Sequence, residues 1–244
     1  MELKICHLYP DVLNLYGDRG NILCLRRRLE WRGIGVTVES AGIGSRPRLA
    51  DCDLVFIGGG QDFEQEVLLD DLHSGKDAEV RSAIEDGTTF LAICAGYQLL
   101  GAYYETYDGR RCDFIGALDL YTVGSERRMI GNCMFTCAPE SGGSAVVAFE
   151  NHSGRTRLGP GVSPLGTVTV GYGNNGEDKT EGARYKNVFA TYSHGPLLPK
   201  NPELCDFILK TALERKYGSV SLAPLDDSAE LAAHDEMARR LAGA

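Results

Sequence analysis

The chain has 244 residues, of which 43% are hydrophobic and 24% are charged, and its formal net charge is −9. This length suits one folded domain with its own core, and these fractions are typical of globular rather than disordered proteins. Because phosphate backbones attract clustered basic groups, the acidic excess argues against a nucleic-acid partner. No stretch approaches the roughly eighteen apolar residues of a membrane span, and the opening residues MELKI lack a signal peptide's apolar core. We therefore expect a cytoplasmic protein without membrane insertion.

The first half of the chain alternates between strand and helix patterns. Residues 2–9 predict a first strand, and residues 21–32 predict a helix whose apolar side chains recur along one stripe. The basic run 26–28, together with Arg32, is interpreted as the solvated face of that helix. Residues 36–38 predict a short second strand.

Two continuous apolar segments follow. Residues 53–57 end in three glycines, 58–60, and residues 88–93 run directly into Cys94. Uninterrupted apolar runs of this length are typical of strands that are covered on both faces. A polar, helical stretch at 64–86 separates them. This alternation predicts an α/β fold with a mostly parallel central sheet flanked by helices.

The second half of the chain has a different character. Residues 112–192 are rich in Gly, Thr and Val and predict additional antiparallel or irregular β structure. Residues 204–217 predict a helix, and residues 228–241 predict a tail helix whose acidic start and basic end match the helix dipole. We expect 1–244 to form a single domain with a helical tail from about 226.

Eight cysteines are scattered along the chain without a C-x-x-C pair. This pattern predicts neither a zinc site nor a disulfide framework, and it suits a reducing compartment. Most of these residues are expected to be small buried hydrophobes. They are Cys6, Cys24, Cys52, Cys94, Cys112, Cys133, Cys137 and Cys205.

Cys94 differs from the other cysteines because it stands between a predicted strand and a predicted helix. A nucleophile on such a strained turn needs small neighbours, and here they are Ala92, Ala95 and Gly96. The turn would hold the thiol at the carboxyl end of a parallel strand, where α/β proteins place their sites. The alternative is a buried structural cysteine.

A thiol nucleophile also needs a base. His194 follows the apolar run 188–190 and precedes Gly195 and Pro196, so a turn could project its imidazole. His152, interpreted as a loop residue, is the main rival. The other three histidines lie in a polar helical stretch, in the tail helix and inside the first strand; they are His73, His234 and His7.

The backbone amides of Gly59, Gly60 and Ala95 are the candidates for an oxyanion hole. Glycine lets a substrate approach the backbone closely, and donors aimed at a developing oxyanion stabilise acyl-transfer transition states. A plain strand-to-helix turn would explain the glycines equally well.

These pieces, in this order, resemble the class I glutamine amidotransferases, which carry a strand, a Gly-Gly loop, a G-x-C-x-G elbow and a downstream histidine. Five longer segments resemble the small glutaminase subunits, of the GatD type, of lipid II isoglutaminyl synthases, in the cobyric acid synthase-like branch. They are spread over most of the chain, from residue 8 to residue 202, and read LYPDVLNLYGDRGNI, FIGGGQDFEQ, FLAICAGYQLLG, FENHSGRT and GYGNNGEDKTEGARYKNVFATYSHGPLLPKNP. The resemblance implies a flavodoxin-like amidotransferase fold.

The resemblance also implies an activity and a partner. L-Glutamine would be hydrolysed here to glutamate and ammonia, with Cys94 as nucleophile, His194 as general base and acid, and Arg128, or its neighbour Arg127, holding the substrate carboxylate. A Mur ligase-like synthetase subunit would form a heterodimer with this chain and amidate D-glutamate in the lipid II stem peptide, a step of peptidoglycan synthesis. ATP and magnesium are expected on that partner, with no metal or cofactor on this chain.

Two positions depart from the family pattern. Ala92 stands where many members carry glycine in the elbow, and Pro196 stands where many carry the glutamate that completes a triad. Glu203 lies further along and is expected to be too distant. The resemblance therefore predicts that the third acid is absent or comes from the partner.

The G-x-G-x-x-G match at 171–176 precedes a polar segment rather than a helix, so it is interpreted as a loop near the site or an interface, not as a dinucleotide site. Two alternatives to a role in peptidoglycan synthesis stay open. The chain could be a glutaminase subunit for another acceptor, such as a cobyrinate-type amidation, or a non-catalytic flavodoxin-like binding module.

Overall fold

A six-stranded sheet forms the centre of the molecule in the computed structural model, which describes residues 1–243 apart from the side chains at 62–64 and 66. Its strand order is β13-β14-β4-β3-β1-β2, and all neighbours are parallel except β13, which is antiparallel to β14. The strands are β1 (Glu2–Leu8), β2 (Gly35–Ala41), β3 (Leu54–Ile57), β4 (Thr89–Ile93), β13 (Ala183–Tyr185) and β14 (Val188–Thr191). Every residue of β3, β4 and β14 is buried, as their continuous apolar runs predict.

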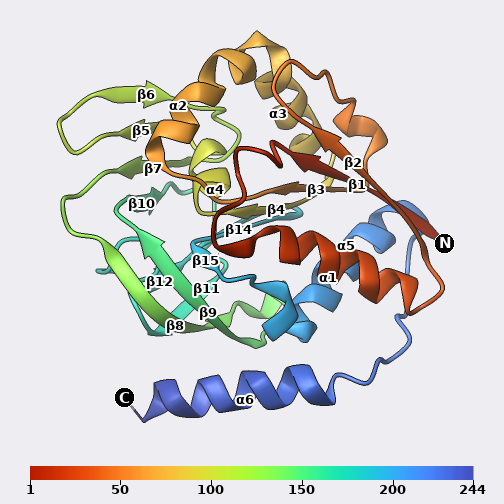
Figure 1. Cartoon of the computed structure of the whole chain (residues 1–244). Helices are drawn as coiled ribbons and strands as arrows, with labels where there is room; N and C mark the ends of the chain where they lie inside the picture. Colours follow the sequence, from red (N-terminus) through yellow and green to blue (C-terminus); the bar gives the residue numbers. More distant parts are fainter. Residues whose placement is uncertain (244) are drawn as a thin grey trace.

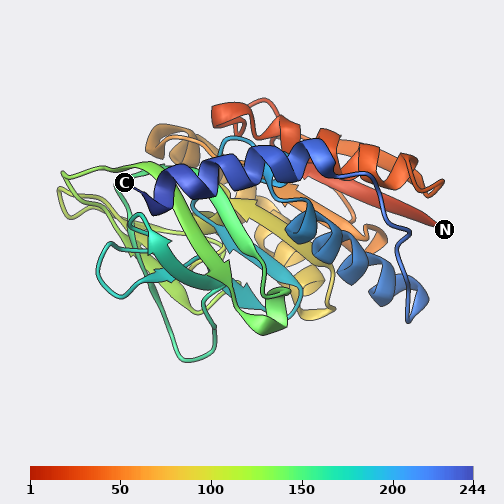
Figure 2. The same cartoon turned by 90° about the horizontal axis from the view of Figure 1, so that it is seen from below.

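Helices cover both faces of this sheet. Helices α1 (Arg19–Glu30) and α5 (Pro202–Tyr217) lie on one face, and α2 (Asp62–Asp71) and α3 (Asp77–Glu85) lie on the other (Figures 1 and 2). The predicted α/β class with a parallel sheet between helices is therefore confirmed. No helix in the described part of the chain is long and apolar enough to cross a bilayer.

The helical stretch predicted at 64–86 is interrupted. Between α2 and α3, Leu72–Lys76 form a π turn, inside which Gly75 has φ 116°. Only glycine adopts this conformation without a steric penalty, so the chain changes direction there. The predicted helical stretch is therefore present, with this break inside it.

Two smaller sheets occupy the second half of the chain, as predicted for 112–192. One has the order β10-β7-β5-β6 and the other β12-β11-β8-β9-β15. Their strands are β5 (Tyr103–Glu105), β6 (Arg111–Asp113), β7 (Leu120–Val123), β8 (Met129–Cys137), β9 (Ala145–His152), β10 (Arg155–Leu158), β11 (Gly166–Val170), β12 (Thr180–Glu181) and β15 (Ser193–His194). Short 3₁₀ turns lie at Leu15–Gly17, Leu49–Asp51, Pro139–Ser141 and Leu198–Lys200.

The chain passes from the central sheet to a smaller one within three residues. Thr191 pairs with Ile93 at the end of β14, whereas Ser193 already pairs with Glu150 of β9. The residue between them, Tyr192, is fully buried. This short crossing sets where the strand β15 lies relative to the carboxyl end of β4.

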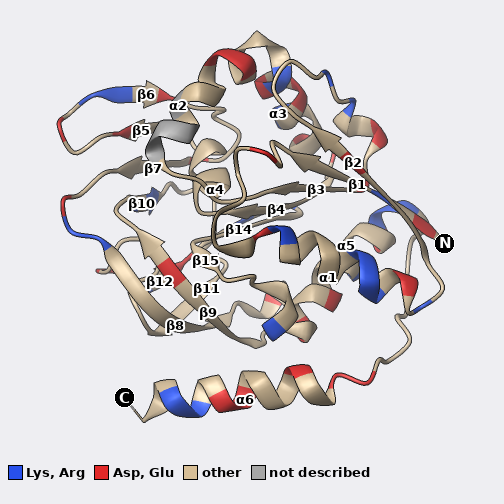
Figure 3. Ribbon diagram, viewed as in Figure 1, with Lys and Arg blue, Asp and Glu red and all other residues tan. Residues whose placement is uncertain are grey.

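The C-terminal helix α6 (Ser228–Ala242) lies along the outside of the molecule, next to η5 (Leu198–Lys200) and the strands β8 and β9 (Figures 1 and 2). The segment leading to it is held by Asp227, whose carboxylate accepts hydrogen bonds from Arg28. Figure 3 shows that α6 carries acidic residues at its start and in its middle, and arginines near its end.

The arginines of α1 do not all face solvent, contrary to the prediction. The Arg28 side chain is only 2% exposed and forms bidentate ion pairs with Asp206 of α5 and with Asp227. The Arg32 side chain is 3% exposed and also contacts Asp206. Buried charges are stable when paired in this way, and here they join α1 to α5 and to the base of the tail.

Candidate active site

Cys94 occupies a sharp turn between β4 and α4 (Ala95–Leu99), with φ 49° and ψ −102°. A non-glycine residue in this region is strained, and such residues occur mostly where the surrounding structure holds them for function. The neighbours must be small: a Cβ on Gly96 would lie 2.7 Å from the carbonyl oxygen of Ile57. The predicted elbow is therefore present, and Ala92 and Ala95 are fully buried beside it.

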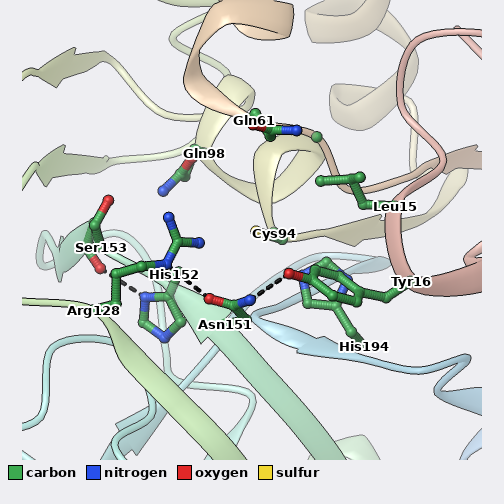
Figure 4. A pocket seen from close by; sticks show the side chains of 12 residues that line it. Leu15, Tyr16, Gln61, Cys94, Gln98, Arg128, Asn151, His152, Ser153 and His194 are labelled. Atoms are coloured by element: carbon green, nitrogen blue, oxygen red, sulfur yellow. Dashed lines mark hydrogen bonds between the residues drawn. The ribbon is translucent and has the colours of Figure 1, made fainter.

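A cavity of about 430 Å³ opens in front of Cys94, within the size range of small-molecule sites (Figure 4). It is lined by residues of β9 and β15, by α4, and by the loops that follow β1, β3, β4 and β9 or precede β8. They are Leu15, Tyr16, Gly60, Gln61, Cys94, Gln98, Arg128, Asn151, His152, Ser153, Gly154 and His194. The structure thus brings Cys94, His194, Gly60 and Arg128, which are far apart in the sequence, to one cavity.

His194 lies at the end of β15, and its side chain is not exposed to solvent. Its Nδ1 is 3.5 Å from Oδ2 of Asp18, and its ring packs edge-on against Tyr16, with ring centres 5.0 Å apart. Burial by itself would lower the pKa of His194, but the Cys94 sulfur and the Asp18 carboxylate outweigh burial and raise this pKa to about 10. Both neighbours therefore favour the protonated form of the imidazole.

His152, the rival base, lines the same cavity but is held differently. It is the last residue of β9 rather than a loop residue, and it is 3% exposed. Its ring stacks on Tyr192 with centres 3.6 Å apart, and its Nδ1 hydrogen-bonds the carbonyl oxygen of Gly154 at 2.8 Å. These contacts suit a cavity wall, whereas His194 interacts with Cys94 itself.

The three backbone amides predicted for an oxyanion hole are not equivalent. The N–H of Gly59 donates to Asp18 Oδ2 at 2.6 Å, so it is already engaged and does not fit the predicted role. Gly60 lines the cavity, and Ala95 follows Cys94 at the start of α4. Of the three predicted donors, the backbone N–H groups of Gly60 and Ala95 therefore remain candidates for the oxyanion hole.

Arg128 lies at the edge of the cavity, and its Nε donates to Asn151 Oδ1 at 2.9 Å (Figure 4). Asn151 in turn donates to the hydroxyl of Tyr16. The side chain of Arg128 is thus held through Nε, and with respect to the described residues its two terminal nitrogens are available for a carboxylate. Arg127 is exposed and is not among the residues that line the cavity.

Buried polar contacts brace the floor of the cavity. Gln98 of α4 donates to the Tyr192 hydroxyl at 2.9 Å and accepts a hydrogen bond from Gln65 of α2. Tyr97 donates to Asn174 Oδ1 at 3.1 Å, so the glycine-rich loop 171–176 supports the elbow from behind. No helix follows this loop, as expected.

Asp18 is the residue of the site that sequence reasoning missed. No acid of this chain was expected beside His194, but the Asp18 carboxylate lies there. Pro196 packs against Gly20 instead, and Glu203 lines a different cavity together with α6. A signal existed: Asp18 follows β1, whose carboxyl end adjoins that of β3. This position of Asp18 indicates a role in the site only when the order of the strands in the sheet is known.

Comparisons with known proteins agree with this architecture. The family of CobB/CobQ-like glutamine amidotransferase domains matches residues 4–202. The chain belongs to this family. It is 44% identical over 232 residues, 95% of this chain and 93% of the relative, to a lipid II isoglutaminyl synthase (glutamine-hydrolyzing) subunit GatD of Staphylococcus aureus. The corresponding subunit of Streptococcus pneumoniae is 42% identical over 89% of this chain and 83% of its own length.

More distant relatives and solved structures extend the comparison. A cobyric acid synthase of Listeria monocytogenes is 30% identical over 59% of this chain and 28% of its own length. PurLQS of Thermotoga maritima superimposes with a TM-score of 0.59 at 16% identity, covering 88% of this chain and 99% of that one. The glutaminase domain of Trypanosoma brucei CTPS gives 0.57 at 13% identity, covering 91% and 96%. At these identities the structures show the fold, and they confirm the predicted amidotransferase fold.

Proposed function

We propose that this chain is the glutaminase subunit of a two-subunit amidotransferase, and that it supplies ammonia for amidation of D-glutamate in the lipid II stem peptide. The observation that carries the glutaminase step is Cys94, held at positive φ in a substrate-sized cavity that the buried His194 also lines. The cell-wall acceptor rests on the names of the two relatives that match nearly the whole chain.

In the proposed chemistry, His194 acts as the general base that takes the proton of the Cys94 thiol. The Cys94 sulfur attacks the side-chain amide carbon of glutamine, and the amides of Gly60 and Ala95 donate to the oxygen that becomes negative. His194 gives its proton to the departing nitrogen, so ammonia leaves and a thioester remains. His194 then takes a proton from water, the resulting hydroxide releases glutamate, and the sulfur becomes the leaving group.

Arg128 supplies the recognition of the amino acid in this proposal. A guanidinium fixed through Nε offers two parallel N–H donors to the α-carboxylate of glutamine. The contact with Asn151, and through it with Tyr16, holds the fork in place. An amide without an α-carboxylate would lose this contact and bind less well.

The acceptor chemistry belongs to a Mur ligase-like partner in this proposal. Amidation of a carboxylate needs activation, and ATP with magnesium on the partner would provide it. The sequence has no G-x-x-x-x-G-K-[ST] loop of the kind that cradles nucleotide phosphates. The relatives at 44% and 42% identity are themselves named as subunits, which supports a division of labour between two chains.

The test uses the complex with the synthetase subunit encoded by the same organism. We expect wild-type complex to release glutamate from glutamine, and diazo-oxo-norleucine to add covalently to Cys94, as read by mass spectrometry. A Cys94→Ala variant should lose both, whereas Cys24→Ala, a half-buried cysteine outside the cavity, should keep both. Labelling spread over the other cysteines would contradict the nucleophile. Co-purification with a cobyrinate-type synthase and no Mur ligase-like chain would contradict the cell-wall acceptor.

A further inference from the structure

Asp18 is a buried carboxylate that contacts both halves of the proposed catalytic machinery. It has no exposed surface. One oxygen, Oδ2, accepts the Gly59 N–H at 2.6 Å and lies 3.5 Å from His194 Nδ1. The other, Oδ1, makes no hydrogen bond within the described residues. A buried carboxylate without a cation is costly, and in the described part of the chain the ion-pair partner of Asp18 is His194.

The loop that carries Asp18 is fastened to the glycine loop at several points. The N–H of Leu15 donates to the Gly59 carbonyl oxygen at 3.1 Å, so both polar atoms of the Gly59 backbone bond to the segment 15–18. The fit is close: a Cβ on Gly58 would lie 2.2 Å from the carbonyl oxygen of Leu13. These contacts hold the loop, and with it Asp18, against the glycine loop.

The same loop also encloses the imidazole. Tyr16 packs edge-on against the His194 ring from the cavity side, and Asp18 faces its Nδ1 from within. The 3.5 Å separation is longer than a formed hydrogen bond, but such contacts in unliganded sites are often long and shorten when substrate binds. An acid facing Nδ1 keeps a proton on that nitrogen and directs Nε2 at the nucleophile.

Building on the proposed glutaminase function, we propose that Asp18 is the positioning residue for His194, and that it ties the imidazole and the glycine loop into one unit. It orients the ring through Nδ1 and fixes Gly59, and thereby the adjacent Gly60 amide, through the same oxygen. This chain then carries its own third acid, and a partner carboxylate is not needed at Nδ1. The acid comes from the loop after β1 rather than from the position of Pro196.

The test compares Asp18→Asn with Asp11→Asn in the complex. Asp11 lies on the same β1–α1 segment but is exposed, so it is a matched control. We expect Asp18→Asn to lower kcat for glutamine about a hundredfold, in line with a 10²–10⁴-fold range for proton-transfer catalysis, with KM changed less than threefold. Asp11→Asn should behave as wild type. A wild-type kcat for Asp18→Asn in the complex would overturn the proposal.

Titration of the histidine separates positioning from a merely structural role. Nitrogen-15 NMR of the imidazole, assigned with a His194→Ala variant, should show wild-type His194 losing its proton well above pH 6.5, the ordinary imidazole value. In Asp18→Asn this midpoint should fall by one unit or more, and in Asp11→Asn it should not move. A kcat loss without this shift would overturn the proposal.

This measurement does not depend on glutamine hydrolysis, so the positioning role and the glutaminase function can fail separately. If Asp18→Asn does not fold, the titration of His194 in the wild-type protein still tests the proposal. A midpoint near pH 6.5, the ordinary imidazole value, would contradict an ion pair between Asp18 and His194.

Discussion

Replacing Gly59 by alanine perturbs the closest contact between the glycine loop and the base. An alanine Cβ at this position would lie 2.4 Å from His194 Cε1 and 3.0 Å from Asp18 Oδ2. The first distance is about 1 Å short of ordinary carbon–carbon contact. Gly59 is not among the glycines with positive φ, so alanine is compatible with the backbone and the imidazole is the group that must move.

A displacement of that size predicts the magnitude of the effect. A 1 Å misplacement of a reacting group costs about a hundredfold in rate, so we expect kcat/KM for glutamine to fall about a hundredfold in Gly59→Ala. Overpacking of a buried site also costs about 1–3 kcal/mol of unfolding free energy, less than a domain of this size has available. The variant should therefore remain folded.

The assay measures glutamate release by the complex, with the melting temperature measured in parallel. Gly42→Ala is the matched control, because a Cβ on Gly42 meets nothing within 4 Å and its φ is not positive. The control should equal wild type in both readings. A folded Gly59→Ala variant with kcat/KM within threefold of wild type would show that the imidazole does not pack against Gly59 during turnover.

Three further predictions concern recognition, pH and stability. Arg128→Lys should raise KM for glutamine at least tenfold by removing the bidentate fork, and Arg127→Lys should leave KM unchanged; equal effects would contradict the assignment. Burial raises the pKa of Glu181 to about 7, so the folded state binds this proton more tightly than the unfolded state. Stability should fall as pH rises from about 4.5 to 7, by about 3 kcal/mol, and Glu181→Gln should lack that fall in urea titrations. Arg28→Met should lower the free energy of unfolding by about 3 kcal/mol, because it removes the buried guanidinium that pairs with the half-buried carboxylates of Asp206 and Asp227; a loss below 1 kcal/mol would show that these ion pairs contribute little.

Much of the fold follows from local sequence patterns. The apolar runs at 53–57 and 88–93 lie in the central sheet because alternation is not needed where both faces are covered. Cys94 could be singled out because a strand, a strained turn and small flanking residues are all visible in one short segment. His194 required only one further inference, that a histidine after a buried strand reaches the carboxyl edge of the sheet.

The remaining features depend on contacts between distant segments. Asp18 contacts His194 because the loop after β1 lies against the loop after β3, and β15, which pairs with β9, ends at the same place; no local pattern encodes this arrangement. Arg28 looked solvated because its two acidic partners lie 178 and 199 positions away in the sequence. The break at Gly75 is different, since a glycine inside a helical stretch is a local signal that could have been used.

The three-residue crossing between sheets has a consequence for how sequences of this kind can change. Cys94 N–H donates to the Thr191 carbonyl oxygen at 2.8 Å, so the nucleophile is tied to one end of the crossing while His194 lies at the other. One inserted residue would turn the imidazole to the opposite face of its strand. Length variation should therefore be absent from 191–194 and concentrate in exposed turns such as the hairpin tip at 107–110. The positions of the nucleophile and the base thus depend on the number of residues between the two sheets.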